Sequence, residues 1–217
     1  MNQKLKTIWL AFEFVLLFFG VPLYIYFDPK LIYPSVLVLP ILVGIFIYLK
    51  RLPNFRFKDL IKLKIPKKEF TLHLLVAVVT AVIMLIIIYL FDHDNLFNLL
   101  KAKPLLLLML CTFYPVFSAY GQEIIYRTFL FYRYRKLFKT DVLIVLASSV
   151  AFSFVHIVYY SHVSILLTLI LGLYLAKIYL KTQSVLFAAI LHGIYGDLVF
   201  IVGLGHYFWL DMFEWMQ

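Results

Sequence analysis

The heptapeptide Gly121-Gln122-Glu123-Ile124-Ile125-Tyr126-Arg127 lies inside an apolar run that begins at Pro104 and is typical of a membrane-buried helix. On a helix, the four-residue spacing places Glu123 and Arg127 on one face, close enough to pair. A buried carboxylate is costly in hydrocarbon, whether it is neutral or ionised beside a partner, so an ionisable pair here predicts a functional site. The alternative is a structural ion pair that locks two helices together.

The composition of the 217-residue chain is that of a membrane protein. Hydrophobic residues make up 65% of it and aromatic residues 19%, whereas a soluble domain is roughly half apolar. Runs of about 20 apolar residues are long enough to cross a hydrocarbon layer of ~30 Å. The formal charge of +9 comes from basic residues in short loops between these runs. It therefore indicates membrane topology and contact with anionic lipids, and we expect no nucleic-acid partner.

The apolar runs predict an all-α fold, a polytopic transmembrane helical bundle of about seven spans that forms a single membrane domain over residues 1–217. The fourth span is too long for a straight crossing at ~1.5 Å per residue, so we expect a tilt, or a kink near Pro115 and Gly121. The expected spans cover residues 8–27, 31–49, 70–91, 104 to the basic run at 133–139, 142–160, 164–180 and 185–204.

The loop at residues 50–69 carries eight basic residues and two acidic ones. This excess predicts a cytoplasmic loop, with the N-terminus inside and the C-terminus outside. Apolar residues between the basic ones predict a short amphipathic helix on the bilayer surface. Glu13, near one edge of the first span, is interpreted as a solvated interfacial carboxylate, and the aromatic tail from Tyr207 to Trp215 as an interfacial belt.

His156 and His192 lie in later apolar runs at a depth similar to that of Glu123. Counted from Arg135, Asp141 and Lys181 on the same predicted side, the depths are roughly 18 Å for Glu123, 22 Å for His156 and 16 Å for His192 at ~1.5 Å per residue. Titratable residues at matched depth on three helices usually face a shared interior cavity. We therefore expect these side chains to converge on a wet pocket near the middle of the bilayer.

Such a cluster suits three kinds of chemistry. A carboxylate can activate water as a general base while two histidines bind the oxyanion that forms at a carbonyl. The same donors can hold zinc and leave a position open for water. They can also relay protons or hold an ion in a transporter, although the sequence shows no inverted repeat. Each histidine alone is also compatible with a purely interhelical hydrogen bond.

Three motifs together resemble the CPBP family of intramembrane proteases, the CAAX-protease and bacteriocin-processing group that includes the Rce1-type endopeptidases. The motifs are Gln122-Glu123-x-x-x-Arg127, Phe152-x-x-x-His156, and His192 four residues before Gly196. The likeness covers a motif-bearing core at residues 104–204. It implies an all-α membrane fold with a water-filled cavity, in which glutamate and histidine activate water for peptide-bond hydrolysis. Members have been described both as metalloproteases and as metal-independent glutamate proteases.

By resemblance, Glu123 matches the second glutamate of the family's paired-glutamate motif and Arg127 matches its arginine. His156 and His192 match the histidines of the second and third motifs. Our hypothesis makes Glu123 the base, oriented by Arg127, while His156 and His192 bind the oxyanion or the water. A divalent metal such as zinc, if the site uses one, would be held by Glu123, His156 and His192. The supporting residues would be Gln122, Phe152 and Asp197.

The sequence departs from the family pattern at two positions. Gln122 stands where the family usually has a first glutamate, commonly assigned as the base, and a glutamine cannot accept a proton in that role. Gly196 stands where an asparagine or aspartate is expected, with Asp197 one residue on. Either Glu123 takes over as base with help from Asp197, or the chain is a variant with weakened or absent proteolysis.

Two functional hypotheses follow from the motifs and their departures. The first is an intramembrane endopeptidase that acts on a peptide or protein near the bilayer, as a multi-pass protein of a bacterial plasma membrane. The second is a non-catalytic membrane protein in bacteriocin immunity or partner binding, which keeps the scaffold without the chemistry.

Overall fold

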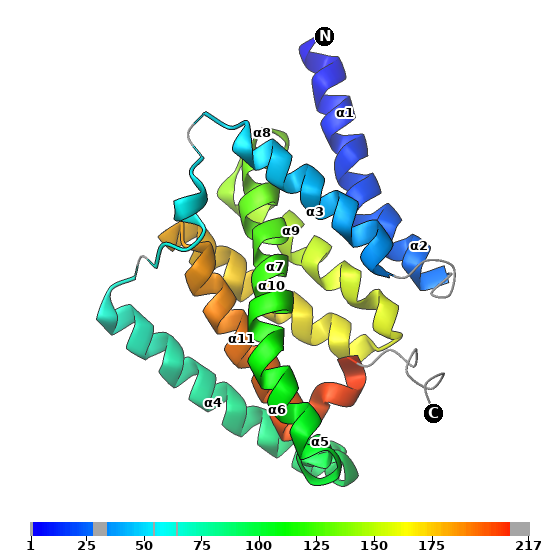
Figure 1. The fold of residues 1–217 in the computed structure, drawn as a ribbon, viewed down its shortest axis with the longest axis vertical. Coiled ribbons are helices and arrows are strands. Elements are labelled where there is room, and N and C mark those ends of the chain that lie inside the picture. Colours follow the sequence, from blue (N-terminus) through cyan, green and yellow to red (C-terminus); the bar gives the residue numbers. More distant parts are fainter. Residues whose placement is uncertain (1, 28–33, 54, 64, 209–217) are drawn as a thin grey trace.

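The computed structural model describes residues 2–27, 34–53, 55–63 and 65–208. Within these ranges the chain is a bundle of helices without strands (Figure 1). In this described part of the chain, six helices are long and apolar enough to cross a membrane: Gln3–Phe27, Lys67–Phe91, Pro104–Phe138, Asp141–Tyr159, His162–Thr182 and Val185–Val202. A shorter apolar helix, α3 (Pro34–Lys50), accompanies them. The all-α bundle of about seven spans is therefore confirmed.

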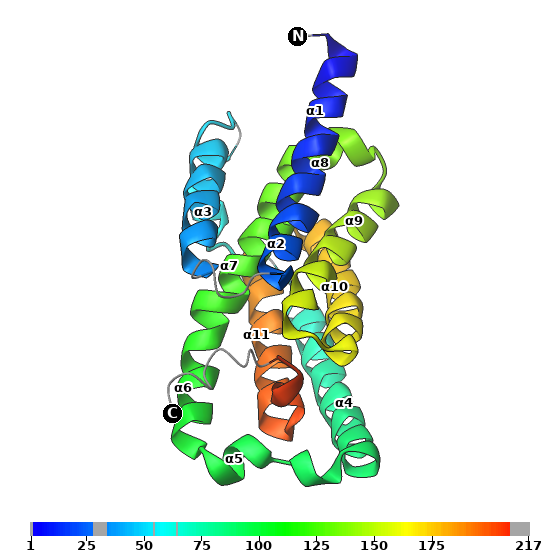
Figure 2. The same cartoon turned by 90° about the vertical axis from the view of Figure 1, so that its right-hand side faces the viewer.

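The boundaries of the elements follow the apolar runs closely, and several spans combine more than one helical element (Figures 1 and 2). The first half contains α1 (Gln3–Val15), η1 (Leu16–Gly20), α2 (Val21–Phe27), η2 (Phe57–Asp59), α4 (Lys67–Phe91), η3 (His93–Asn95) and α5 (Asn98–Ala102). The second half contains α6 (Pro104–Phe113), η4 (Tyr114–Ala119), α7 (Tyr120–Glu123), η5 (Ile124–Phe129), α8 (Leu130–Phe138), α9 (Asp141–Phe154), η6 (Val155–Tyr159), α10 (His162–Thr182), α11 (Val185–Val202) and η7 (Leu204–Phe208).

Two predicted features fall partly outside the described residues. The second expected span starts at residue 31, and residues 31–33 are outside them, as are the residues of the aromatic tail after Phe208. The basic loop is described over most of its length. It contains the single turn η2 in place of the amphipathic surface helix that we expected. Prolines at positions 53 and 66 break up this short segment, because a proline lacks the N–H that a helix interior needs.

The long fourth span is interrupted where the sequence predicted a kink. Pro115 has no N–H to close an α-helical hydrogen bond, and the chain around it forms the π-helical segment η4. A second π-helical segment, η5, begins directly after Glu123. Gly121 lies in the single α-helical turn α7 between them. Such π-helical segments often occur at functional sites, and here two of them flank the carboxylate.

The last helix, α11, lies at the centre of the bundle and contacts α4, α10 and the α6–α7 segment (Figures 1 and 2). A second close contact joins α9 to α10. A Cβ atom added to Gly172 of α10 would lie 3.2 Å from the Cα atom of Ser149 on α9. Small residues therefore let these two backbones approach each other, as expected for helices in a membrane.

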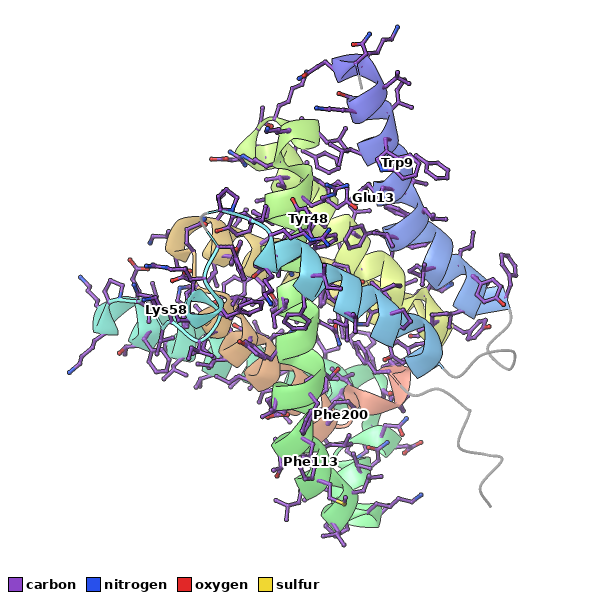
Figure 3. The ribbon with its side chains drawn as sticks, turned by 45° about the horizontal axis from the view of Figure 1, so that its top comes forward. Trp9, Glu13, Tyr48, Lys58, Phe113 and Phe200 are labelled. Atoms are coloured by element: carbon purple, nitrogen blue, oxygen red, sulfur yellow. The ribbon has the colours of Figure 1, made fainter. Side chains whose placement is uncertain are left out.

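The basic loop lies at the same end of the bundle as the turn between α10 and α11. The Ser184 hydroxyl donates a hydrogen bond to the Lys62 carbonyl at 2.8 Å, and Lys181 pairs with Glu69 at 3.0 Å. Figure 3 shows Lys58 near this end. At the far end of α4, Asp92 pairs with His206 of η7 at 3.2 Å. This arrangement agrees with the boundaries used to compare the depths of the site residues.

Glu13 is not the solvated interfacial carboxylate that we expected. Arg133 of α8 donates two hydrogen bonds to it, at 2.8 and 2.6 Å, and the Tyr134 hydroxyl donates a third at 2.8 Å. The Arg133 guanidinium also lies 5.0 Å from the centre of the Tyr48 ring on α3. Figure 3 shows Glu13 and Tyr48 between α1 and α3. This cluster joins α1, α3 and α8.

Replacing Glu13 with glutamine should destabilise the protein by about 1–3 kcal/mol, because Arg133 then loses a half-buried, charged acceptor. The matched control is Asp141→Asn, which removes the acid of the exposed Arg135–Asp141 pair and should cost no more than about 0.5 kcal/mol. Unfolding of the detergent-solubilised variants measures both effects. Equal losses in the two variants would contradict a structural role for the Glu13 cluster.

Candidate functional site

Glu123 and Arg127 form the ion pair that their spacing predicted. The Arg127 Nε donates to Glu123 Oε2 at 2.9 Å, and both side chains are fully buried. The same guanidinium donates to the Ser148 hydroxyl on α9, which in turn donates to the Tyr126 carbonyl at 2.8 Å. The pair thereby connects the fourth span to α9. Because arginine stays protonated in proteins, a partner this close keeps Glu123 ionised.

His192 of α11 contacts this carboxylate directly. Its Nδ1 lies 2.9 Å from Glu123 Oε1. An ionised carboxylate can only accept a hydrogen bond, so Nδ1 carries the proton and donates it. In the neutral imidazole, Nε2 is then an acceptor, and the Tyr114 hydroxyl lies 3.0 Å from it. A continuous chain of hydrogen bonds thus runs from Tyr114 of η4 through His192, Glu123 and Arg127 to Ser148 on α9.

His156 lies beside this chain and not in it. It occupies the 3₁₀ turn η6 at the end of α9, where its Nδ1 donates to the Phe152 carbonyl at 2.7 Å. A carbonyl can only accept, so in the neutral ring Nε2 is an acceptor. The Phe152 ring centre lies 5.1 Å from the His156 ring and 5.2 Å from the His192 ring. The structure therefore brings Glu123, Arg127 and His192 into contact and places His156 one aromatic ring away.

The supporting residues occupy different surroundings. Phe152 is fully buried, and its ring lies 5.2 Å from the Arg127 guanidinium carbon. Gln122 donates to the Ser118 hydroxyl at 2.9 Å, while its own buried Oε1 has no hydrogen-bond partner among the described residues. One oxygen of Asp197 is likewise buried without a partner in the described part of the chain. The proposed help of Asp197 to Glu123 stays a prediction.

The donor atoms of this site do not fit the implied three-ligand zinc site. Both oxygens of Glu123 and both ring nitrogens of His192 already have partners within 3.0 Å. A tetrahedral zinc site needs three such atoms to converge on one point. Among the described residues, no group of three His, Cys, Asp or Glu side chains is arranged to hold a metal ion. Zinc binding by Glu123, His156 and His192 stays a prediction.

Tyr114 is the site residue that sequence reasoning missed. It lies in an apolar, aromatic run, and its side chain reaches His192 from a π-helical turn, whose geometry the periodicity of the sequence does not indicate. The available signal was Gly196, a residue without a side chain where a polar one was expected. A Cβ atom at position 196 would lie 2.6 Å from Tyr114 Cζ and 2.7 Å from its hydroxyl oxygen.

Comparison with known proteins supports the resemblance that the motifs suggested. Residues 103–196 match the family model described as Rce1-like, type II CAAX prenyl endopeptidase Rce1-like. Neither the curated proteins nor the solved structures gave a significant match to the chain. The matched segment runs from the start of α6 to Gly196 and contains Glu123, His156 and His192. Over this segment, the chain is therefore similar to the Rce1-like family of type II CAAX prenyl endopeptidases.

Proposed function

We propose that the protein is an intramembrane endopeptidase that hydrolyses a peptide bond in a membrane-associated peptide or protein. The observation that carries this proposal is the buried hydrogen bond of 2.9 Å between Glu123 and His192, inside the segment that matches the family. A carboxylate that holds an imidazole in one tautomer is a recurrent way to prepare a general base. The family description names CAAX prenyl endopeptidases, so prenylated CAAX peptides are the first substrates to test.

The geometry favours a different division of roles from the one in our sequence-based hypothesis, in which Glu123 is the base. Both carboxylate oxygens of Glu123 are engaged, and its side chain has no exposed surface. Glu123 is therefore better placed to support His192 than to contact water itself. Its negative charge holds the His192 proton on Nδ1 and stabilises the imidazolium that forms when Nε2 accepts a second proton. In this proposal, His192 is the base and Glu123 and Arg127 position it.

The reaction then needs a water molecule at His192 Nε2. This nitrogen has one lone pair, so the water replaces the neutral Tyr114 hydroxyl that occupies it in the resting state. The water oxygen attacks the peptide carbonyl carbon while its proton passes to Nε2, which gives a tetrahedral oxyanion. The same proton moves from Nε2 to the amide nitrogen as the C–N bond breaks, which releases an amine and a carboxylic acid. His156 contacts the same Phe152 ring as His192. Its Nε2 can orient the water or, once protonated, donate to the oxyanion.

Cleavage of fluorogenic peptides by the detergent-purified protein tests the proposal. The panel contains peptides that end in a farnesylated CAAX box and the same peptides without the lipid. The wild type should cleave at least one of them, and His192→Ala should reduce kcat by about 10²–10⁴-fold, the usual contribution of a general base. His93→Ala is the control, because this exposed histidine lies in η3 outside the matched segment. A wild type that cleaves no peptide, or a fully active His192→Ala variant, would overturn the proposal.

A non-catalytic role in bacteriocin immunity or partner binding is the second candidate. Two observations favour it: Gln122 cannot accept a proton, and the Glu123 carboxylate is sealed from solvent and lipid. Cells that express Glu123→Gln should then resist a bacteriocin as well as cells that express the wild type. Protection that disappears in this variant would favour the endopeptidase.

A further inference from the structure

Two glycines of α11 allow the π-helical segment η4 to lie directly against that helix. A Cβ atom at Gly193 would lie 2.8 Å from the Cβ atom of Pro115, and one at Gly196 would overlap the Tyr114 ring. Contacts this short cannot form without movement of the backbone or the rings, because protein interiors are close-packed. Glycine at both positions is therefore what lets Tyr114 reach the interior of the bundle.

The Tyr114 ring is held in place on more than one side. It makes edge contacts with the ring of His192, at a centre-to-centre distance of 6.0 Å, and with that of Phe200, at 5.6 Å. Figure 3 shows Phe200 in the lower half of the bundle, where it also shows Phe113, the neighbour of Tyr114 in the chain. The hydroxyl therefore points at His192 Nε2 from a fixed ring and forms the 3.0 Å contact there.

We propose that Tyr114 is a positioning residue for His192, which delivers a hydroxyl into the gap left by Gly196 and holds the imidazole at the nitrogen opposite Glu123. This inference rests on the proposed function, because the nitrogen that Tyr114 contacts, His192 Nε2, is the one that accepts the proton in that function. The hydroxyl donates to Nε2 in the resting state. The reacting water then takes the place of the hydroxyl at Nε2, so Tyr114 fixes the orientation of the ring until the water binds.

The variant Tyr114→Phe tests this role because it keeps the ring and removes only the hydroxyl. We expect kcat to fall about tenfold, the effect of one net hydrogen bond, with an unchanged KM and a thermal midpoint lowered by only about 2–4 °C, as expected for one hydrogen bond. A readout that does not need activity is the NMR signal of the ring nitrogens in protein with isotope-labelled histidine. The His192 signals, assigned by their absence in His192→Gln, should move in Tyr114→Phe. Unmoved signals with full activity would overturn the inference.

A double variant that changes positions 114 and 196 together provides a sharper test. Gly196→Asn alone should lower the thermal midpoint, because its Cβ overlaps the Tyr114 ring. The double variant Tyr114→Ala, Gly196→Asn removes that ring and places an amide beside His192. It should be more stable than Gly196→Asn and more active than Tyr114→Ala. A double variant that gains neither stability nor activity would show that the two positions are independent.

The measurements separate failure of this inference from failure of the proposed function. If the wild type cleaves no peptide, the proposed function fails, while the nitrogen signals and the thermal midpoints still report on the contact between Tyr114 and His192. If the wild type cleaves and Tyr114→Phe is fully active with unmoved His192 signals, only the role of Tyr114 fails.

Discussion

Replacing Arg127 with methionine should lower the free energy of unfolding by about 3–5 kcal/mol, because one partner of a buried ion pair then stays charged and unpaired. Glu123 and Arg127 have no exposed side-chain surface, so water cannot compensate the remaining carboxylate. Methionine preserves much of the apolar stem of the arginine, so the loss reports mainly on charge. Reversible unfolding in mixed detergent micelles measures it.

The double variant Glu123→Gln, Arg127→Met separates charge from packing. Removing both members of a buried pair is often neutral or stabilising, whereas removing one is costly. The double variant should therefore be more stable than Arg127→Met and yet inactive, because glutamine cannot carry the charge that fixes the His192 tautomer. A double variant as unstable as Arg127→Met would show that Arg127 acts through its contacts with Ser148 and Phe152 instead.

The parts of the site that could be predicted from the sequence depend on regular helix geometry. The Glu123–Arg127 pair follows from a local spacing on one helix. The meeting of Glu123 and His192 follows from a fixed rise per residue, which gives depth along each span. The predicted span boundaries were likewise close to the observed ones. For example, the span predicted at residues 185–204 is the helix Val185–Val202 in the structure, because apolar runs end where the lipid does.

The features that sequence reasoning missed depend on departures from regular geometry or on distant partners. The depth of a residue along a span does not show which way its side chain faces around the helix axis. For His156, that direction is set by the 3₁₀ turn η6. The π-helical turn η4 places Tyr114 against α11 without a periodic signal in the sequence. Glu13 was assigned to the interface because its partner Arg133 lies 120 positions away, and no local pattern joins them.

The same irregular segments explain why a buried carboxylate can persist in this bundle. A charged group in a membrane interior is stable only with an opposite charge or hydrogen-bond donors beside it. Arg127 supplies one partner from the next turn of the same span, and His192 supplies the other from α11. The approach of η4 to the glycines of α11 brings the fourth span close enough for the second contact. The stability of the buried carboxylate and the proposed chemistry therefore both depend on the contact between η4 and α11.

Replacing His156 with alanine should reduce kcat by about 10²–10³-fold, the usual effect of losing a group that stabilises the oxyanion. The proposal gives His156 this role through its Nε2 atom, because Nδ1 is already bound to the Phe152 carbonyl at 2.7 Å. Cleavage of the peptide that the wild type prefers measures the loss, with the thermal midpoint recorded for each variant.

The matched control is His73→Ala. His73 is also a partly buried histidine in a span, and its Nδ1 lies 2.6 Å from the Tyr174 hydroxyl, but it belongs to α4, outside the matched segment. Its loss should lower stability and leave kcat within about threefold of the wild type, because it removes a structural hydrogen bond of about 1 kcal/mol. Equal losses of kcat in the two variants would mean that His156 acts only through packing. Full activity in His156→Ala would restrict the chemistry to His192 and its partners Glu123 and Tyr114.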